Sequence, residues 1–118
     1  MIRVLRLYTG DDGQSHVSDE HVELEPAGPN RQSPWQPANG VRFEETPAGS
    51  ALAWHDAPRA QYVLTLSGRL EFTTRDGERF EIGPGDVLLD DDTTGGGHSW
   101  RILGPEPWRR AYVALAQP

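Results

Sequence analysis

The sequence predicts an all-β protein, and three observations support this prediction. Short runs rich in Val, Ile, Leu, Phe and Tyr alternate with turn residues at the spacing of a sandwich or barrel. Thirteen glycines and ten prolines occur among the 118 residues, and the prolines are scattered along the whole chain, which disfavours helices. No window of eleven residues shows a clean helical period. We therefore expect about nine strands and no helix.

The first half of the chain is predicted to hold short strands and one long arm. A Gly/Asp-rich turn at Thr9–Gln14 follows the first strand. Pro26–Gly40 contains four prolines in fifteen residues and is predicted as a meandering loop or arm. The strands expected here are Ile2–Tyr8, Val22–Glu25, Val41–Thr46 and Ala51–His55.

The second half shows clearer strand patterns. Gln61–Ser67 carries no charge on either face, so both faces are expected to be covered. Asp76–Gly77 is the strongest hairpin signal in the chain, and Gly83–Asp86 predicts a sharp corner. The strands expected here are Gln61–Ser67, Arg69–Arg75, Arg79–Ile82, Val87–Leu89, Ser99–Leu103 and Arg109–Leu115.

Composition and charge exclude several classes of protein. The chain has no Cys, which rules out disulfides, thiolate metal sites and Cys nucleophiles, and it has no Lys, which rules out Schiff-base chemistry. Its net charge is −7, so we expect no nucleic-acid partner. The sequence shows neither a signal peptide nor a membrane-spanning run, and we expect a cytoplasmic protein.

The chain is expected to form one domain over residues 1–118. In this division, residues 1–48 form N-terminal strands and an arm, residues 49–103 form a barrel core that carries the motifs, and residues 104–118 form a closing strand.

The most informative stretch runs from Gly49 to Gly68. Its key positions are Gly49, His55, Ala57, Gln61 and Gly68, separated by five, one, three and six residues. This spacing resembles the first motif of the cupin superfamily, which reads Gly, five residues, His-x-His, three or four residues, Glu, six residues, Gly. Every interval fits, but Ala57 stands where the second His is expected and Gln61 stands where Glu is expected.

A second stretch extends the resemblance. Gly83–Val87 is similar to the corner of the second cupin motif, and His98 is similar to its histidine, while Ile102 occupies a place where Asn is common. The resemblance covers Gly49–Ile102, nearly half of the chain, and is closest to small single-domain bacterial cupins of an uncharacterised group. It implies a jelly-roll β-barrel, also called a double-stranded β-helix, and a homodimer.

The candidate site consists of residues at one end of this barrel. If Gln61 faces inward, Val63 and Thr65 do as well, and His55 and His98 lie at the ends of neighbouring strands. We expect His55, Gln61, Val63 and His98 to bind a small-molecule ligand, with Arg59 placed to bind a substrate carboxylate.

A metal is the second expectation for this site. His55, Gln61 and His98 are candidate ligands of a divalent transition metal, namely Zn, Fe, Mn or Ni, and His16 is a candidate fourth ligand if the N-terminal arm folds over the barrel mouth. The alternative is a metal-free pocket in which the two histidines form hydrogen bonds to a ligand or to structural partners. No catalytic residue can be assigned from the sequence.

Other polar and aromatic clusters are assigned structural roles. The three aspartates Asp90–Asp92 are expected in a solvated loop in which one of them caps a turn. Trp54 and Trp100 are expected to point away from the neighbouring histidines, and Trp35 and Trp108 are candidate anchors of a dimer interface.

The function predicted from the sequence is small-molecule binding in the barrel. One hypothesis is a metal-dependent enzyme of the dioxygenase, isomerase or cyclase type. The alternative is a non-catalytic ligand-binding or sensing module whose metal site is degraded. The fold alone does not choose between them.

Overall fold

The computed structural model describes residues 1–116, and all regular structure among them is β-strand, which confirms the all-β prediction. The strands are β1 (Ile2–Thr9), β2 (Ser15–Val22), β3 (Glu25–Ala27), β4 (Asn30–Gln32), β5 (Ala38–Thr46), β6 (Ala51–His55), β7 (Gln61–Ser67), β8 (Arg69–Thr74), β9 (Arg79–Ile82), β10 (Val87–Asp91), β11 (His98–Leu103) and β12 (Trp108–Leu115).

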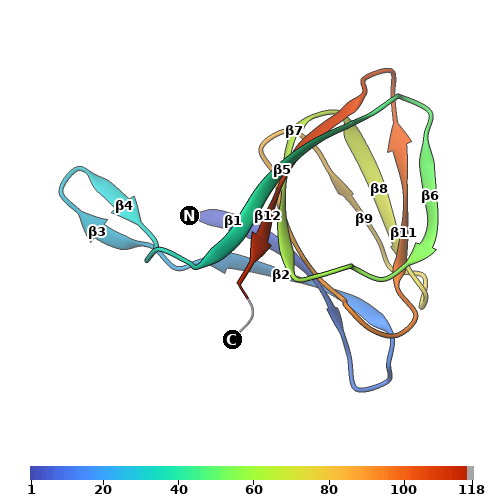
Figure 1. Cartoon of the computed structure of the whole chain (residues 1–118), viewed down its shortest axis with the longest axis horizontal. Coiled ribbons are helices and arrows are strands. Elements are labelled where there is room, and N and C mark those ends of the chain that lie inside the picture. Colours follow the sequence, from blue (N-terminus) through green and yellow to red (C-terminus); the bar gives the residue numbers. More distant parts are fainter. Residues whose placement is uncertain (117–118) are drawn as a thin grey trace.

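Two sheets form the two walls of a barrel. The larger sheet has six strands in the order β2-β1-β10-β7-β12-β5, and the smaller has four strands in the order β6-β11-β8-β9. Figure 1 shows β5, β12 and β7 on one side of the barrel and β8, β11 and β6 across from them. Most neighbours are antiparallel, but β1 pairs with β10 in parallel. This parallel pair brings the N-terminal strand alongside the strand that carries the aspartates.

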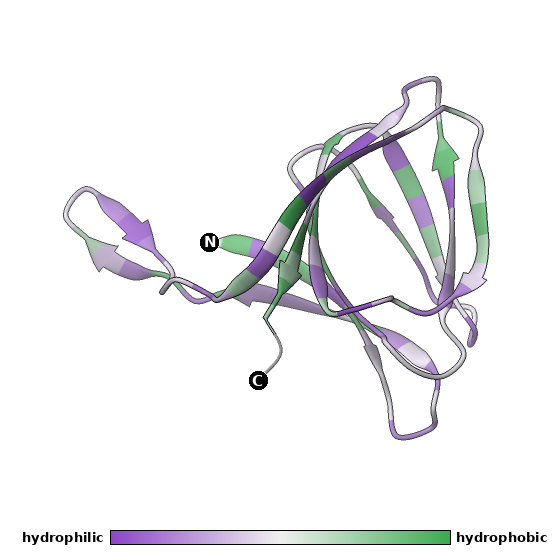
Figure 2. Ribbon diagram, in the orientation of Figure 1, coloured by the Kyte–Doolittle hydropathy of each residue, from purple (hydrophilic) through white to green (hydrophobic). Residues whose placement is uncertain are grey.

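The core lies between the two sheets. Strand β7 buries Val63 and Thr65 on its inner face, and β8 buries Leu70 and Phe72, as period-two alternation requires. Figure 2 shows the corresponding alternation of hydrophilic and hydrophobic residues along β8. The outer face of β7 is less covered than predicted, because Leu66 is 58% exposed.

Three sequence-based expectations are corrected in the first half of the chain. The stretch Val22–Glu25 is not a strand; instead β2 ends at Val22 and β3 begins at Glu25. The Pro-rich arm is not irregular throughout, because β3 and β4 form a hairpin and β5 already begins at Ala38. This hairpin projects away from the barrel (Figure 1). Pro26 lies within β3, and proline is tolerated there because β3 pairs on one side only, with β4.

The turns of the second half follow the sequence. The hairpin at Asp76–Gly77 joins β8 to β9, and the amide of Gly77 donates to the Thr74 carbonyl at 3.0 Å. At the corner before β10, the Gly83 amide donates to the Asp86 carboxylate at 2.7 Å. Among residues 1–116 there is no helix with the length and apolar character needed to cross a membrane.

Candidate functional site

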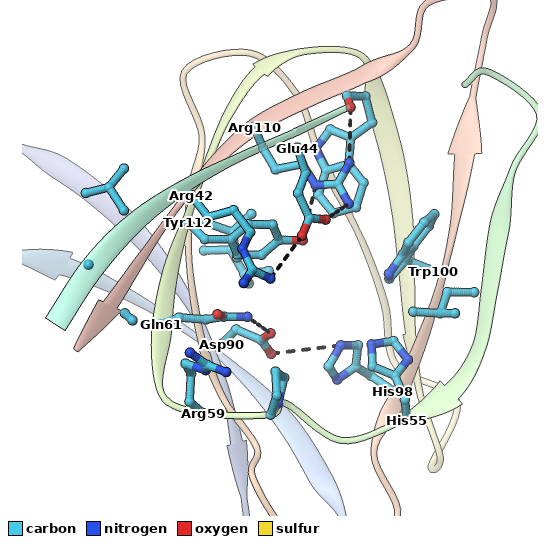
Figure 3. A pocket seen from close by; sticks show the side chains of 18 of the residues that line it. Arg42, Glu44, His55, Arg59, Gln61, Asp90, His98, Trp100, Arg110 and Tyr112 are labelled. Atoms are coloured by element: carbon cyan, nitrogen blue, oxygen red, sulfur yellow. Dashed lines mark hydrogen bonds and ion pairs between the residues drawn. The ribbon is translucent and has the colours of Figure 1, made fainter. Parts of the chain in front are cut away.

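The barrel encloses a cavity of about 420 Å³ that collects side chains from both sheets. Its lining includes five residues that the sequence singled out as a ligand-binding set: His55, Arg59, Gln61, Val63 and His98. Figure 3 shows the rings of His55 and His98 side by side on one wall, with Gln61 and Arg59 across from them. The structure therefore brings the predicted residues to one place; their role in binding stays a prediction.

Both cavity histidines present their Nε2 atom to the cavity. The His55 Nδ1–H donates to the Ala53 carbonyl at 2.8 Å, and the His98 Nδ1–H donates to the Asp92 carboxylate at 2.6 Å. Neither Nε2 atom has a hydrogen bond to any described residue. The two ring centroids lie 4.4 Å apart. Histidines that ligate metals are fixed in this way, with one ring nitrogen held by a carbonyl or carboxylate and the other free.

The position of His55 depends on a close backbone approach. Gly97 has φ of +74°, and a Cβ atom built on it would lie 2.2 Å from the His55 carbonyl oxygen. Only glycine permits both the positive φ and this contact. The glycine-rich stretch before β11 thus sets the spacing between the strand that ends at His55 and the strand that begins at His98.

Two aspartates that were expected in a solvated loop are buried in the site. Asp90 is 7% exposed and Asp92 is fully buried. Strand β10 extends to Asp91, so Asp90 points inward with Leu88 and lines the cavity. Asp91 points the other way and pairs with Arg6 at 2.9 Å. The sequence contained the signal: positions 88, 90 and 92 share one face of an extended chain, and Leu88 is apolar.

Asp90 is next to the position where the cupin motif has its glutamate. Asp90 pairs in register with Gln61, whose Nε2 donates to Asp90 Oδ2 at 3.3 Å. The other oxygen, Oδ1, is buried without a hydrogen-bond partner and lies 3.9 Å from His98 Nε2. The carboxylate that Gln61 does not supply is thus provided by the neighbouring strand.

Asp92 orients the His98 ring through a hydrogen bond to its Nδ1 atom. Its Oδ2 accepts the His98 Nδ1–H and also the hydroxyl of Ser15 at 2.5 Å. Ser15, at the start of β2, is fully buried and was not predicted as part of the site. This network orients the His98 ring and holds its Nε2 toward Asp90.

The pKa values of Asp90, Asp92, His98 and His55 are all shifted by their surroundings. Burial raises the pKa of Asp90 to about 7, and the Asp92 carboxylate adds to this effect. Burial also raises the pKa of Asp92, but hydrogen bonds from His98 and Ser15 outweigh it, so the net pKa is lowered. For His98, burial lowers the pKa, yet the bond to Asp92 and the charge of Asp90 leave it above its usual value. Burial lowers the pKa of His55, which favours its neutral form.

A cation would satisfy the atoms that this cluster leaves unpaired. Asp90, Asp92 and His98 each offer a ligand atom within 4.8 Å of the others. The atoms without a hydrogen-bond partner are His98 Nε2, Asp90 Oδ1 and Asp92 Oδ1, and imidazole nitrogen with carboxylate oxygen is a donor set that Zn, Fe, Mn and Ni accept. These residues therefore fit a divalent transition metal; His55 is not one of the three, although its ring centroid lies 4.4 Å from that of His98.

His16 is not part of this site, contrary to the expectation that it supplies a fourth ligand. Its Nε2 lies 2.9 Å from Asp12, and its Nδ1 lies 3.3 Å from Asp76 and 3.5 Å from Glu78, on the outside of the barrel. The hydrogen bond to Asp12 raises the pKa of His16. His16, Asp76 and Glu78 thus form a separate exterior cluster, and neither nitrogen of the ring faces the cavity.

Two aromatic assignments are also corrected. Trp100 does not point away from His98; it lies two residues along β11, shares its face and lines the cavity. Trp108 is 2% exposed and belongs to the core, where its Nε1–H donates to Thr65 at 3.2 Å, so it does not anchor a dimer interface. Trp35 is fully exposed on the arm.

Comparison with solved structures decides the fold family. The cupin domain of Cnp3 from Schizosaccharomyces pombe matches 99% of this chain and 89% of that domain with a TM-score of 0.54, at 15% identity. The chain has a cupin fold. The jelly-roll prediction is thereby confirmed.

Two bacterial structures share this cupin fold. A DUF861 family protein from Thermotoga maritima is 27% identical over 63% of this chain and 77% of that protein, with a TM-score of 0.53. A protein with a double-stranded β-helix domain from Klebsiella pneumoniae is 24% identical over 64% of this chain and 61% of that protein, with a TM-score of 0.51. No model of a protein family and no curated protein matches the sequence significantly.

Proposed function

We propose that this cupin barrel binds a small organic molecule next to a divalent transition metal, and that Asp90 and His98 hold the metal. The observation that carries the proposal is the buried Asp90 Oδ1, which has no hydrogen-bond partner and lies 3.9 Å from His98 Nε2. Asp92 supports His98 as a carboxylate supports a metal-bound histidine. His55, with its own Nε2 free, is the third donor.

The donor set differs from the one that the sequence predicted. Gln61 was expected as a ligand, but it donates its amide N–H to Asp90 and so positions the carboxylate. Ala57, in the place of the second motif histidine, is buried and its amide donates to the Asp92 carbonyl at 2.9 Å. Two imidazoles and one carboxylate form the donor set of many zinc and non-haem iron sites.

A metal here would act as a Lewis acid toward an oxygen of the bound molecule. The chain supplies the remaining parts of the site. Trp100, Phe72 and Leu88 give the cavity apolar walls. Burial lowers the pKa of His55, which favours the neutral ring whose Nε2 lone pair can bind the metal. This arrangement supports a metal-dependent enzyme of the dioxygenase, isomerase or cyclase type.

A second candidate is a metal-free ligand-binding module, and one observation favours it. Because burial raises the pKa of Asp90 to about 7, a proton can satisfy this carboxyl group without any cation. A protonated Asp90 would donate a hydrogen bond, and the cavity would then bind its ligand through hydrogen bonds alone.

Zinc titration distinguishes the two candidates. The protein is stripped with a chelator, dialysed and titrated with ZnCl₂ by isothermal calorimetry. The variants His98→Gln and Asp90→Asn are titrated in the same way. The control is His16→Gln, which removes the imidazole of the exposed cluster of His16, Asp76 and Glu78. We expect one zinc per chain, weakened at least about tenfold in the first two variants and unchanged in the control. Circular dichroism confirms that each variant is folded. Equal zinc affinity in all three variants would contradict the metal proposal.

We also propose that the chain forms a homodimer through apolar side chains on β5 and the arm. Phe43 is 74% exposed, Val41 is 62% exposed and Trp35 is fully exposed. Exposed aromatic residues of this kind are enriched at interfaces. Light scattering after size exclusion should give the mass of two chains, and Phe43→Ser should give that of one. A wild-type protein that elutes as a monomer at micromolar concentration contradicts this proposal.

A further inference from the structure

Arginines gather on the side of the cavity that faces the histidines. The chain carries a net charge of −7, yet Arg42, Arg59 and Arg110 line the cavity against only two acidic residues, Glu44 and Asp90. Figure 3 shows the side chains of Arg42 and Arg59 across the cavity from the two histidine rings. Arg42 and Arg59 are exposed, so they lie at the mouth of the cavity, where their charges attract anions from solution.

Arg110 is fully engaged and has a structural role. Its guanidinium donates to the Tyr112 hydroxyl at 3.1 Å, to the Thr46 hydroxyl at 2.6 Å and to Glu44 Oε2 at 3.0 Å. It also lies 3.7 Å from the centre of the Trp108 ring. These contacts hold Glu44 in place and neutralise its charge, so Arg110 is not available to a ligand.

Arg42 and Arg59 keep most of their donors free. Arg42 is 3.7 Å from Glu44 Oε1, beyond hydrogen-bond distance, and that carboxylate already pairs with Arg110. Arg59 forms no hydrogen bond or ion pair with any of residues 1–116. A guanidinium offers five N–H donors in a fork that matches a carboxylate.

We propose that the ligand of this cavity is a small organic acid. Its carboxylate binds Arg59 and Arg42, its apolar part lies against Trp100 and Phe72, and an oxygen at its other end faces His98 and Asp90. This inference rests on the proposed small-molecule site and names the class of molecule in it. A carboxylate matches the planar fork of a guanidinium, and inorganic phosphate is the competing anion in the test. The volume of about 420 Å³ lies in the lower part of the range for small-molecule sites, roughly 300–1,000 Å³.

The test uses linear dicarboxylates with two to six carbons, each paired with its neutral diamide, and inorganic phosphate as a third probe. Binding to the zinc-loaded protein is followed by tryptophan fluorescence and by the melting temperature. We expect at least one dicarboxylate to bind and to raise the melting temperature while its diamide does neither. Arg59→Gln should weaken this binding roughly ten- to a hundredfold, because a charged hydrogen-bonded pair is lost.

The control variant is Arg101→Gln, which removes an exposed arginine paired with Glu71 on the outer face of β11 and should leave binding unchanged. Zinc titration of Arg59→Gln separates the metal proposal from the ligand proposal, because Arg59 is not one of the proposed metal donors. If zinc binds but no dicarboxylate binds better than its diamide, the ligand class is wrong and the metal site stands. If phosphate binds as tightly as the best dicarboxylate, the site is a general anion site and the carboxylate assignment is overturned. If zinc does not bind the wild type, the metal proposal fails, and dicarboxylate binding to the metal-free protein then decides the ligand class.

Discussion

Replacing Asp90 by asparagine tests the energetics of the buried cluster. The substitution keeps the size of the side chain, its oxygen can still accept the Gln61 amide, and its new N–H can donate to the unpaired oxygen of Asp92. In the wild-type protein without metal, the pKa of Asp90 is about 7 in the folded state against 3.8 for the free side chain. At 1.36 kcal/mol per pKa unit, holding this carboxylate ionised in the fold costs about 4 kcal/mol.

The sign of the pH dependence follows from the raised pKa. Above pH 7 both folded and unfolded chains carry an ionised Asp90, so the full cost is present; as the pH falls from 7 toward 3.8, the folded state takes up the proton first and the cost disappears. In chelator, Asp90→Asn should therefore be more stable than wild type by about 4 kcal/mol at pH 8, and by about 1 kcal/mol at pH 4.5. Urea unfolding at both pH values measures this difference.

Zinc should narrow the difference in stability between Asp90→Asn and the wild type at pH 8. A ligand at one hundred times its dissociation constant stabilises the folded state by about 2.7 kcal/mol, and only the wild type gains this term in full. A variant that is less stable than wild type at pH 8 in chelator, or an advantage that does not change with pH, would refute the assignment of Asp90 as a strained, buried carboxylate.

Three further substitutions test other parts of the account. In chelator, His98→Gln should cost about 3–5 kcal/mol in urea unfolding, because the fully buried Asp92 loses its charged partner; an effect below about 1 kcal/mol would contradict the network. Gly97→Ala should lower the free energy of unfolding by at least about 1 kcal/mol and weaken zinc binding, because the new Cβ meets the His55 carbonyl. Zinc binding that is unchanged in calorimetry would show that the close approach of Gly97 to His55 is not required. Ile82→Ala should cost about 2–5 kcal/mol while zinc affinity stays at the wild-type value, because Ile82 is buried opposite Leu70 and does not line the cavity; a loss of affinity in the folded variant would mean that the site depends on the distant core.

The fold and the location of the cavity were predictable from the sequence because both depend on local spacing. Alternation and turn residues identified most strands, and the intervals from Gly49 to Gly68 placed His55 and Gln61 where they face the cavity with His98. The alternation of side chains along a strand and the presence of glycine in a turn both depend on residues that are close in sequence, so sequence patterns can predict them.

The chemistry of the site was less predictable because it depends on pairing between distant strands. Asp90 and Asp92 were read as a solvated run of like charges, although continuing the alternation from Leu88 would have turned both inward. Ser15 reaches Asp92 across 77 positions of sequence. His16 was expected at the barrel mouth, but the register of β2 against β1 places it beside the turn that joins β8 and β9, next to Asp76 and Glu78. The partners of Ser15 and His16 are set by sheet order, which no local pattern contains.

Anomalous diffraction from crystals grown with zinc tests the central claim most directly. The account predicts a peak in the cavity at about 2.0–2.2 Å from His98 Nε2 and from an Asp90 oxygen, with His55 adjacent. Data collected on both sides of the zinc edge identify the element at the peak. A crystal whose only zinc peak lies at the exposed cluster of His16, Asp76 and Glu78, or one whose cavity contains no anomalous scatterer, would contradict the account.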